Sequence, residues 1–152
     1  MLGSRRIVHR GKTLDLTFED DVSLLDVVQG ALAVRSASRG CQDGSCGTCR
    51  VLVDGRAVNA CKLPWRDVAS GACIESHEDV SQSPPVQRAL AAFDLERPTR
   101  CSLCVGSLGV TAEALERAGK AGDADAVEAA LVDATCVCTG RGSLRRALLS
   151  SR

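Results

Sequence analysis

Nine cysteines are the residues of this sequence best suited to chemistry. Eight of them fall into two groups of four: Cys41, Cys46, Cys49 and Cys61, then Cys101, Cys104, Cys136 and Cys138. The first group reads C-x4-C-x2-C, and its fourth member follows after eleven intervening residues; the second combines a C-x2-C pair with a C-x-C pair. Because tetrathiolate coordination needs four sulfurs per site, eight ligands predict two metal sites. Cys73 is left over and is expected to be a small buried hydrophobic residue in a strand.

Glycines occur throughout the first cysteine loop, at Gly40, Gly44 and Gly47. Glycine adopts positive φ without a steric penalty, so the loop can wrap closely around a cluster and aim backbone N–H groups at its sulfurs. A three-cysteine loop of this kind is the plant-type iron–sulfur pattern, whereas zinc favours two separate short knuckles. The spacing therefore favours a [2Fe–2S] cluster, with a structural zinc site as the alternative. A Rieske centre is excluded, because His9 and His77 form no Cys-His pair, and both are expected to be solvated.

Composition narrows the classes of function. The 152 residues carry 19 Lys plus Arg against 19 Asp plus Glu, and this balance argues against a nucleic-acid binder or a polybasic membrane module. Aromatic residues make up 2%, too few for a base-stacking platform. No run approaches the roughly 18 apolar residues of a membrane span, and the first residues fit no Sec or twin-arginine signal. We expect a cytoplasmic chain, in which clustered cysteines more often bind metal than form disulfides.

Short strands and one helix are expected to position the first cysteine group. A hairpin is predicted at the start of the chain, and Asp54–Gly55 predicts the turn of a second hairpin between apolar runs. Ser23 is placed to cap the helix. The predicted elements outside the second hairpin are strands over 5–10, 13–19 and 71–76 and a helix over 24–34. This pattern indicates an α+β fold, with a sheet wrapped over a helix.

The rest of the chain is predicted to be helical. The polar stretch HEDVSQSPP ends in two prolines and indicates a linker, so we divide the chain into residues 1–77, a linker over 78–86, and residues 87–152. Ala, Leu and Glu then recur at helical spacing over 86–96, 111–121, 123–134 and 143–151. Four helices with short connections predict a small bundle, with the later cysteine pairs at breaks between helices.

Three segments of the sequence resemble one protein family. The pattern CQDGSCGTCRVLVDGRAVNAC, followed by CSLC and CVCTG, closely resembles the small iron–sulfur subunit of the molybdenum hydroxylases, the family of xanthine dehydrogenase, aldehyde oxidase and carbon monoxide dehydrogenase. The resemblance extends from about Arg6 to Leu149. The eleven residues between Cys49 and Cys61 match this family and not the plant ferredoxins, whose fourth cysteine lies much later.

The resemblance implies a fold and a function. It implies an N-terminal ferredoxin-like β-grasp domain followed by a C-terminal four-helix-bundle domain, each holding a [2Fe–2S] cluster. The first cluster would use the first group of four cysteines, and the second cluster would use the second group. Electrons would pass from a molybdopterin site through both clusters to FAD or another acceptor. The partners would be a large molybdopterin-binding subunit together with a medium FAD-binding subunit, so this chain alone would carry out no substrate chemistry.

Two positions near the second cysteine group depart from the family pattern. Arg100 stands where relatives have a Gln that contacts the pterin, and Arg141 stands where they have a Tyr. Both changes add positive charge and would raise the potential of the second cluster, because the reduced form is more negative. They also motivate an alternative function, a free-standing two-cluster electron carrier without a molybdenum partner. A non-redox, zinc-stapled interaction module is the third hypothesis.

Overall fold

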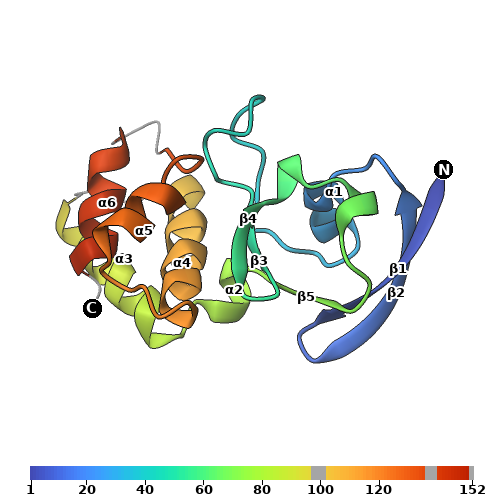
Figure 1. Cartoon of the computed structure of the whole chain (residues 1–152), viewed down its shortest axis with the longest axis horizontal. Helices are drawn as coiled ribbons and strands as arrows, with labels where there is room; N and C mark the ends of the chain where they lie inside the picture. Colours follow the sequence, from blue (N-terminus) through green and yellow to red (C-terminus); the bar gives the residue numbers. More distant parts are fainter. Residues whose placement is uncertain (97–101, 136–139, 151–152) are drawn as a thin grey trace.

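The computed structural model describes residues 1–96, 102–135 and 140–150 (Figure 1). Five strands form a mixed sheet: β1 (Leu2–His9), β2 (Lys12–Glu19), β3 (Arg50–Val53), β4 (Arg56–Asn59) and β5 (Ala72–Glu75). The helices of the described residues are α1 (Leu24–Gly30), α2 (His77–Val80), α3 (Pro84–Glu96), α4 (Ser102–Arg117), α5 (Ala124–Ala130) and α6 (Gly140–Ser150). Two short 3-10 turns, Ala60–Lys62 and Trp65–Asp67, follow β4. The chain is therefore α+β, as its sequence predicts.

The strands lie in the order β2-β1-β5-β3-β4. β1 and β2 form an antiparallel hairpin, and β5 pairs parallel with β1 and antiparallel with β3. β3 and β4 form a second antiparallel hairpin across Asp54 and Gly55, which both take positive φ. Positive φ at both turn residues matches the right-handed twist of the strands, which is why an Asp-Gly pair marks such a turn. Both predicted hairpins are confirmed.

One buried cluster lies between α1 and the sheet. The Ser23 hydroxyl accepts a hydrogen bond from the Asp26 N–H at 3.3 Å and caps α1, as the sequence predicts. The helix buries Leu24, Leu25, Val27 and Val28. It ends at Gly30, four residues before the predicted end. Trp65, which is fully buried, belongs to the same cluster; its ring N–H donates to the Gly3 carbonyl at 2.7 Å.

A second buried cluster lies among the helices. Helix α3 packs against α4 and α6, and α5 contacts both α4 and α6. Figure 1 shows these four helices on one side of the β3–β4 hairpin, with α1 and the β1–β2 hairpin on the other. Strand β3 contributes to both buried clusters, because successive side chains of a strand point to opposite faces. Val51 belongs to the cluster around α1, whereas Leu52 belongs to the cluster among the helices.

The helical half differs from expectation at two places. The helix predicted to begin at residue 111 begins at Ser102 instead, so Cys104 lies in the first turn of α4 and not at a break. The stretch predicted as a linker contains most of α2 and the start of α3. A capping box between Ser76 and Asp79 stabilises the single turn of α2, because each side chain hydrogen-bonds to the other's backbone. The division into two domains stays a prediction.

The expectation that both histidines are solvated is wrong. β1 is an interior strand of the sheet, and His9 at its end is 6% exposed, with Nδ1 2.9 Å from the Ile74 carbonyl. His77 is half-buried, and its Nδ1 is fully covered and has no hydrogen-bond partner in the described part of the chain. The burial of the two histidines could not be predicted from the alternation of side chains along a strand, because the residues that cover them come from elsewhere in the chain: β5 covers His9 and α4 covers His77. No helix within the described ranges is long and apolar enough to cross a membrane.

Candidate metal centre

The β3–β4 hairpin brings the last two cysteines of the first group, Cys49 and Cys61, together. Cys49 immediately precedes β3, and Cys61 follows β4 in the 3-10 turn. The hairpin register pairs Arg50 with Asn59, and the Ala60 N–H donates to the Cys49 carbonyl at 3.4 Å. The eleven intervening residues are therefore two paired strands, the tight turn between them and Ala60, and they carry the chain back to its starting point. This register explains why a fourth ligand so near in sequence can reach the loop.

Hydrogen bonds within this group join Cys41 to Cys46 and Cys49 to Cys61. The backbone N–H of Cys46, directed at the Cys41 thiol, lowers the pKa of Cys41, and contacts with the Cys46 side chain and the Gly44 N–H act in the same direction. Burial raises the pKa of Cys61 to about 12, and a hydrogen bond with the Cys49 thiol adds to the effect. Two sulfurs per iron is the requirement of a two-iron centre.

The arrangement of the ligands in the chain bears on the zinc alternative. Zinc sites take their sulfurs from two separate short knuckles, whereas here a single glycine-containing loop supplies Cys41, Cys46 and Cys49. Together with Cys61, these thiols fit the donor set of a [2Fe–2S] cluster.

The loop backbone approaches the sulfurs closely. A Cβ at Gly40 would lie 2.5 Å from the Thr48 hydroxyl and 3.1 Å from the Cys46 sulfur, so no side chain fits there. Gly47 has φ +72° and also has no space for a Cβ. The Thr48 hydroxyl donates to the Ser38 carbonyl at 2.9 Å and lies 3.1 Å from the Cys46 sulfur. The loop is thus fixed around its sulfurs by hydrogen bonds as well as by glycine.

Exposure differs within the first cysteine group. Cys46 and Cys49 are buried, whereas Cys41 and Cys61 are half-buried. Beside Cys41, hydrogen bonds from Ser45 lower the pKa of Asp43 to about 2, so this carboxylate is ionised at neutral pH. The half-buried thiols therefore lie towards solvent, with the Asp43 carboxylate beside Cys41 and the positive charge of Arg39 near Cys61, while the buried thiols face the protein. An electron carrier needs such a solvent-facing side, because electrons must leave the site towards a partner.

The second cysteine group is described at one position. Cys104 is buried in α4, at 3% exposure. Cys101, Cys136, Cys138 and Arg100 lie outside the described residues, and so does the expected break around Pro98. Arg141 is described: its guanidinium donates to the Glu128 carboxylate and to the Glu128 carbonyl, both at 2.9 Å. Arg145 also pairs with Glu128, so this carboxylate offsets part of the positive charge predicted here.

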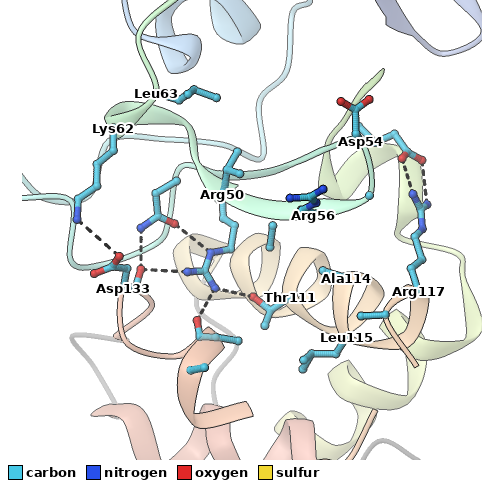
Figure 2. Close-up of a pocket in the computed structure, with 18 of the residues that line it drawn as sticks. Arg50, Asp54, Arg56, Lys62, Leu63, Thr111, Ala114, Leu115, Arg117 and Asp133 are labelled. Atoms are coloured by element: carbon cyan, nitrogen blue, oxygen red, sulfur yellow. Dashed lines mark hydrogen bonds and ion pairs between the residues drawn. The ribbon is translucent and has the colours of Figure 1, made fainter. Parts of the chain in front are cut away.

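Two polar residues of this site were missed by the sequence analysis. Arg50 and Asn59 are buried, and they hydrogen-bond to each other at 3.0 Å beside the first cysteine loop (Figure 2). Burial lowers the pKa of Arg50, although the nearby charges of Asp133 and Cys49 act in the opposite direction. One signal for Arg50 was present in the sequence: this charged residue stands between Cys49 and the apolar run 51–53, at the start of a predicted strand.

A ferredoxin-like fold with four paired thiols defines a [2Fe–2S] protein. In agreement, residues 7–78 match the family model described as a 2Fe-2S iron-sulfur cluster binding domain. The chain is 35% identical over 113 residues to the alpha subunit of isoquinoline 1-oxidoreductase from Brevundimonas diminuta, covering 72% of each chain. It is 31% identical over 109 residues to an aldehyde oxidoreductase of Megalodesulfovibrio gigas, covering 72% of this chain and 12% of that protein. The chain belongs to the family of small iron–sulfur subunits of molybdenum hydroxylases.

A solved structure supports the same assignment. The aldehyde oxidoreductase from Desulfovibrio gigas superposes with a TM-score of 0.79 at 27% identity, over 97% of this chain and 16% of that chain. The first curated relatives are longer than this chain, which spans 12%, 66% and 41% of them. Nearly all of this fold is therefore shared with a larger enzyme of the family.

Proposed function

We propose that this chain is the electron-transfer subunit of a molybdenum hydroxylase. It would pass electrons from a molybdopterin site through two [2Fe–2S] clusters to FAD or another acceptor. The observation that supports this most directly is the register of the β3–β4 hairpin, which returns the chain at Cys61 to Cys49, at the end of the glycine loop that carries Cys41 and Cys46. Each cluster, when bound, supplies one-electron redox chemistry. The chain's own residues hold the irons, direct N–H groups at sulfur and keep one side of the site dry.

The ligand assignment follows the two cysteine groups. The first cluster would be held by Cys41, Cys46, Cys49 and Cys61, within a loop that needs Gly40, Gly44 and Gly47. The second would be held by Cys101, Cys104, Cys136 and Cys138. The burial of Cys104 in α4 supports a site inside the helical half. A β-grasp domain over 1–77 and a four-helix domain over 87–152 would each carry one [2Fe–2S] cluster. The two separate groups of buried hydrophobic residues, one around α1 and one among the helices, support that division.

The partners and the location are further parts of the proposal. A large subunit would carry molybdopterin and all substrate chemistry, and a medium subunit would carry FAD. Arg100 would lie on the side facing the pterin. The complex would be cytoplasmic. Relatives named as the alpha subunit of isoquinoline 1-oxidoreductase and the small subunit of nicotine 6-hydroxylase support the role of one subunit in an oxidoreductase.

Metal analysis of the natively purified protein tests the proposal. We expect about four iron and four acid-labile sulfide per chain, two of each per cluster, together with molybdenum and partner subunits in the same fraction. Zinc in colourless protein would reject any iron–sulfur function. About two iron per chain would remove the second cluster and with it the electron path to molybdenum.

A free-standing carrier is the second candidate. It is favoured by Arg100 in place of the Gln expected beside the first cysteine of the second group. This candidate predicts a brown monomer with both clusters and no molybdenum on native gel filtration. Co-elution with a molybdenum-containing subunit would exclude it.

A further inference from the structure

Arg50 is a buried cation that hydrogen-bonds to uncharged oxygens. Arg50 follows Cys49 directly in the sequence and is only 7% exposed to solvent. The guanidinium donates to four oxygens: Asn59 Oδ1 at 3.0 Å, Thr111 Oγ1 at 3.0 Å, and the carbonyls of Ala130 at 2.8 Å and Asp133 at 3.4 Å. Burying a charge costs free energy unless it is well hydrogen-bonded, and an apolar side chain of similar size is often at least as stable. The position therefore calls for a role other than stability.

The four acceptors come from β4, from α4, from the end of α5 and from the turn that follows α5; Figure 2 labels Arg50 with two of these residues, Thr111 and Asp133. Asn59 ends β4, two residues before Cys61. Thr111 lies in α4, two helical turns beyond Cys104. Ala130 is the last residue of α5, and its carbonyl belongs to the negative end of that helix, where a cation is favoured. One guanidinium thus connects the first cysteine loop to the helices of the second cysteine group.

Residues 133–135, which lead into Cys136, rest on the first cysteine loop itself. The Asn59 amide donates to the Gly44 carbonyl at 3.0 Å and to the Asp133 carbonyl at 2.8 Å. The Thr135 N–H donates to the Ser45 carbonyl at 3.3 Å. A Cβ on Gly47 would come within 2.7 Å of the Asp133 carbonyl, so the two backbones are in direct contact.

Charge alone does not account for this junction. Lys62 pairs with the Asp133 carboxylate at 3.6 Å, but both side chains are about half exposed, and exposed ion pairs contribute little to stability. Arg50 is different because its planar fork points several donors in fixed directions at acceptors on different elements. A lysine ammonium at the end of a flexible stem cannot reach all of them at once.

We propose that Arg50 is the positioning residue that fixes residues 130–135 against the first cysteine loop, and so holds the two iron–sulfur centres at one separation and orientation. The second half of this statement rests on the proposed function; the first half does not. Arg50 touches no cluster atom in this role. It acts through Asn59, through the end of α5 and through Thr111.

Hydrogen exchange measured by mass spectrometry tests the first half on the full chain. We compare Arg50→Met, Arg50→Lys and the matched control Arg56→Met with the wild type. Arg56 is an exposed arginine in β4, and it lines the same pocket between the β3–β4 hairpin and α4 as Arg50 does (Figure 2). We expect amide exchange over 130–135 and 43–48 to accelerate at least about tenfold in both Arg50 variants, because Ala130, Asp133 and Asn59 lose a buried partner. Arg56→Met should match the wild type.

Two exchange results would overturn the inference. Unchanged exchange in Arg50→Met would show that the guanidinium does not hold the junction. Wild-type exchange in Arg50→Lys would show that the charge matters and the fork does not. Where Arg50→Met yields no folded protein, Thr111→Val replaces it, since this variant removes one acceptor of the Arg50 guanidinium and keeps the shape of α4. Thr111→Val should accelerate exchange over 130–135 by a smaller factor than Arg50→Met. No acceleration in Thr111→Val would count against the proposal.

Electron paramagnetic resonance of the fully reduced complex tests the second half. Two one-electron-reduced clusters at a fixed separation broaden or split each other's signals, and this interaction falls steeply with distance. We expect the interaction to change in Arg50→Met and to stay the same in Arg56→Met. An unchanged interaction despite faster exchange would refute the control of cluster separation by Arg50. The iron content of the wild type distinguishes a failure of this second half from a failure of the proposed function. A wild type without two iron–sulfur clusters rejects the proposed function. The hydrogen-exchange result decides in either case whether Arg50 holds the junction.

Discussion

At the scale of single residues, the first cysteine loop depends on positions that must remain small. Gly40 faces the Thr48 hydroxyl and the Cys46 sulfur at distances shorter than a Cβ tolerates. Any side chain there would push on groups that carry or orient a cluster ligand. This is a different constraint from positive φ, which applies at Gly44 and Gly47.

Replacing Gly40 by alanine should remove iron from the first site. The added Cβ would displace Thr48 or the Cys46 sulfur, and Cys46 would be less able to serve as a cluster ligand. We expect about half of the iron and sulfide of the wild type, measured on purified protein together with the visible absorbance. Gly30→Ala is the control, because nothing lies within 4 Å of the added Cβ there. Full iron content in Gly40→Ala would show that the loop yields without loss.

His77 makes folding sensitive to acid. Burial lowers its pKa below the usual 6.5, and the charge of Glu78 only partly opposes this effect. The unfolded chain therefore binds a proton more readily than the folded chain. The stability that follows from neutral His77 is fully present above pH 6.5 and is lost as the pH falls below 6.5 towards the folded pKa.

Denaturant unfolding at several pH values checks this prediction. The free energy of unfolding of the wild type should fall between about pH 7.5 and about pH 5 by more than that of His77→Gln, which has no titrating ring. Equal losses in the two proteins would show that the acid sensitivity comes from other groups.

At the scale of elements, α4 owes its position to glycines that the sequence analysis could not interpret. A Cβ on Gly109 would lie 2.3 Å from His77 Nδ1 and 3.0 Å from Val86, so α2 and α3 pack directly on the backbone of α4. Glycine is a poor helix former, and the segment before residue 111 therefore gave no helical signal. The helix forms there because packing outweighs propensity.

Gly109→Ala should destabilise the protein by about 1–3 kcal/mol, the usual cost of overpacking. The added methyl group improves helix propensity by about 1 kcal/mol, so the net loss tests whether close packing dominates. The free energy of unfolding from denaturant titration measures it. Gly142→Ala in α6 is the matched control, because the nearest atom to its Cβ is at the far end of the long Arg146 side chain, at 3.2 Å, and we expect no loss there.

Local signals in the sequence were sufficient for some elements and insufficient for others. The turn at Asp54–Gly55 and the cap at Ser23 depend on residues next to one another, and both were predicted. The burial of His9 and the junction at Arg50 depend on contacts with residues more than 60 positions away, such as Ile74 and Thr111. No local pattern encodes such contacts. The cysteine spacing was informative because the hairpin itself is local.

At the scale of the whole molecule, β3 belongs to both buried clusters, so the two halves should unfold together. Val51 belongs to the buried cluster that contains α1 residues and Trp65, whereas Leu52 belongs to the cluster among the helices, which contains Phe93 and Leu108. Arg117 adds a second connection, since it donates from α4 to the Glu75 carboxylate of β5 at 2.6 Å and 3.0 Å. A disruption of one half is therefore transmitted to the other through the same strand.

Two probes separate the halves experimentally. Trp65 is the only tryptophan and reports on the cluster around α1, while far-ultraviolet circular dichroism reports mainly on the helices. In the wild type, we expect both signals to change at the same denaturant concentration, as in a two-state transition. Separate midpoints would contradict the shared role of β3.

Leu52→Ala should lower both midpoints together. Truncating this fully buried leucine leaves a cavity among the helices and should cost about 2–5 kcal/mol. Leu95→Ala removes the same atoms from a leucine that is 91% exposed, and it should change stability by less than about 0.5 kcal/mol. If Leu52→Ala shifts the dichroism and leaves Trp65 fluorescence unchanged, the halves fold independently. Cluster separation would then depend on polar junctions such as Arg50 alone, without the support of a common core.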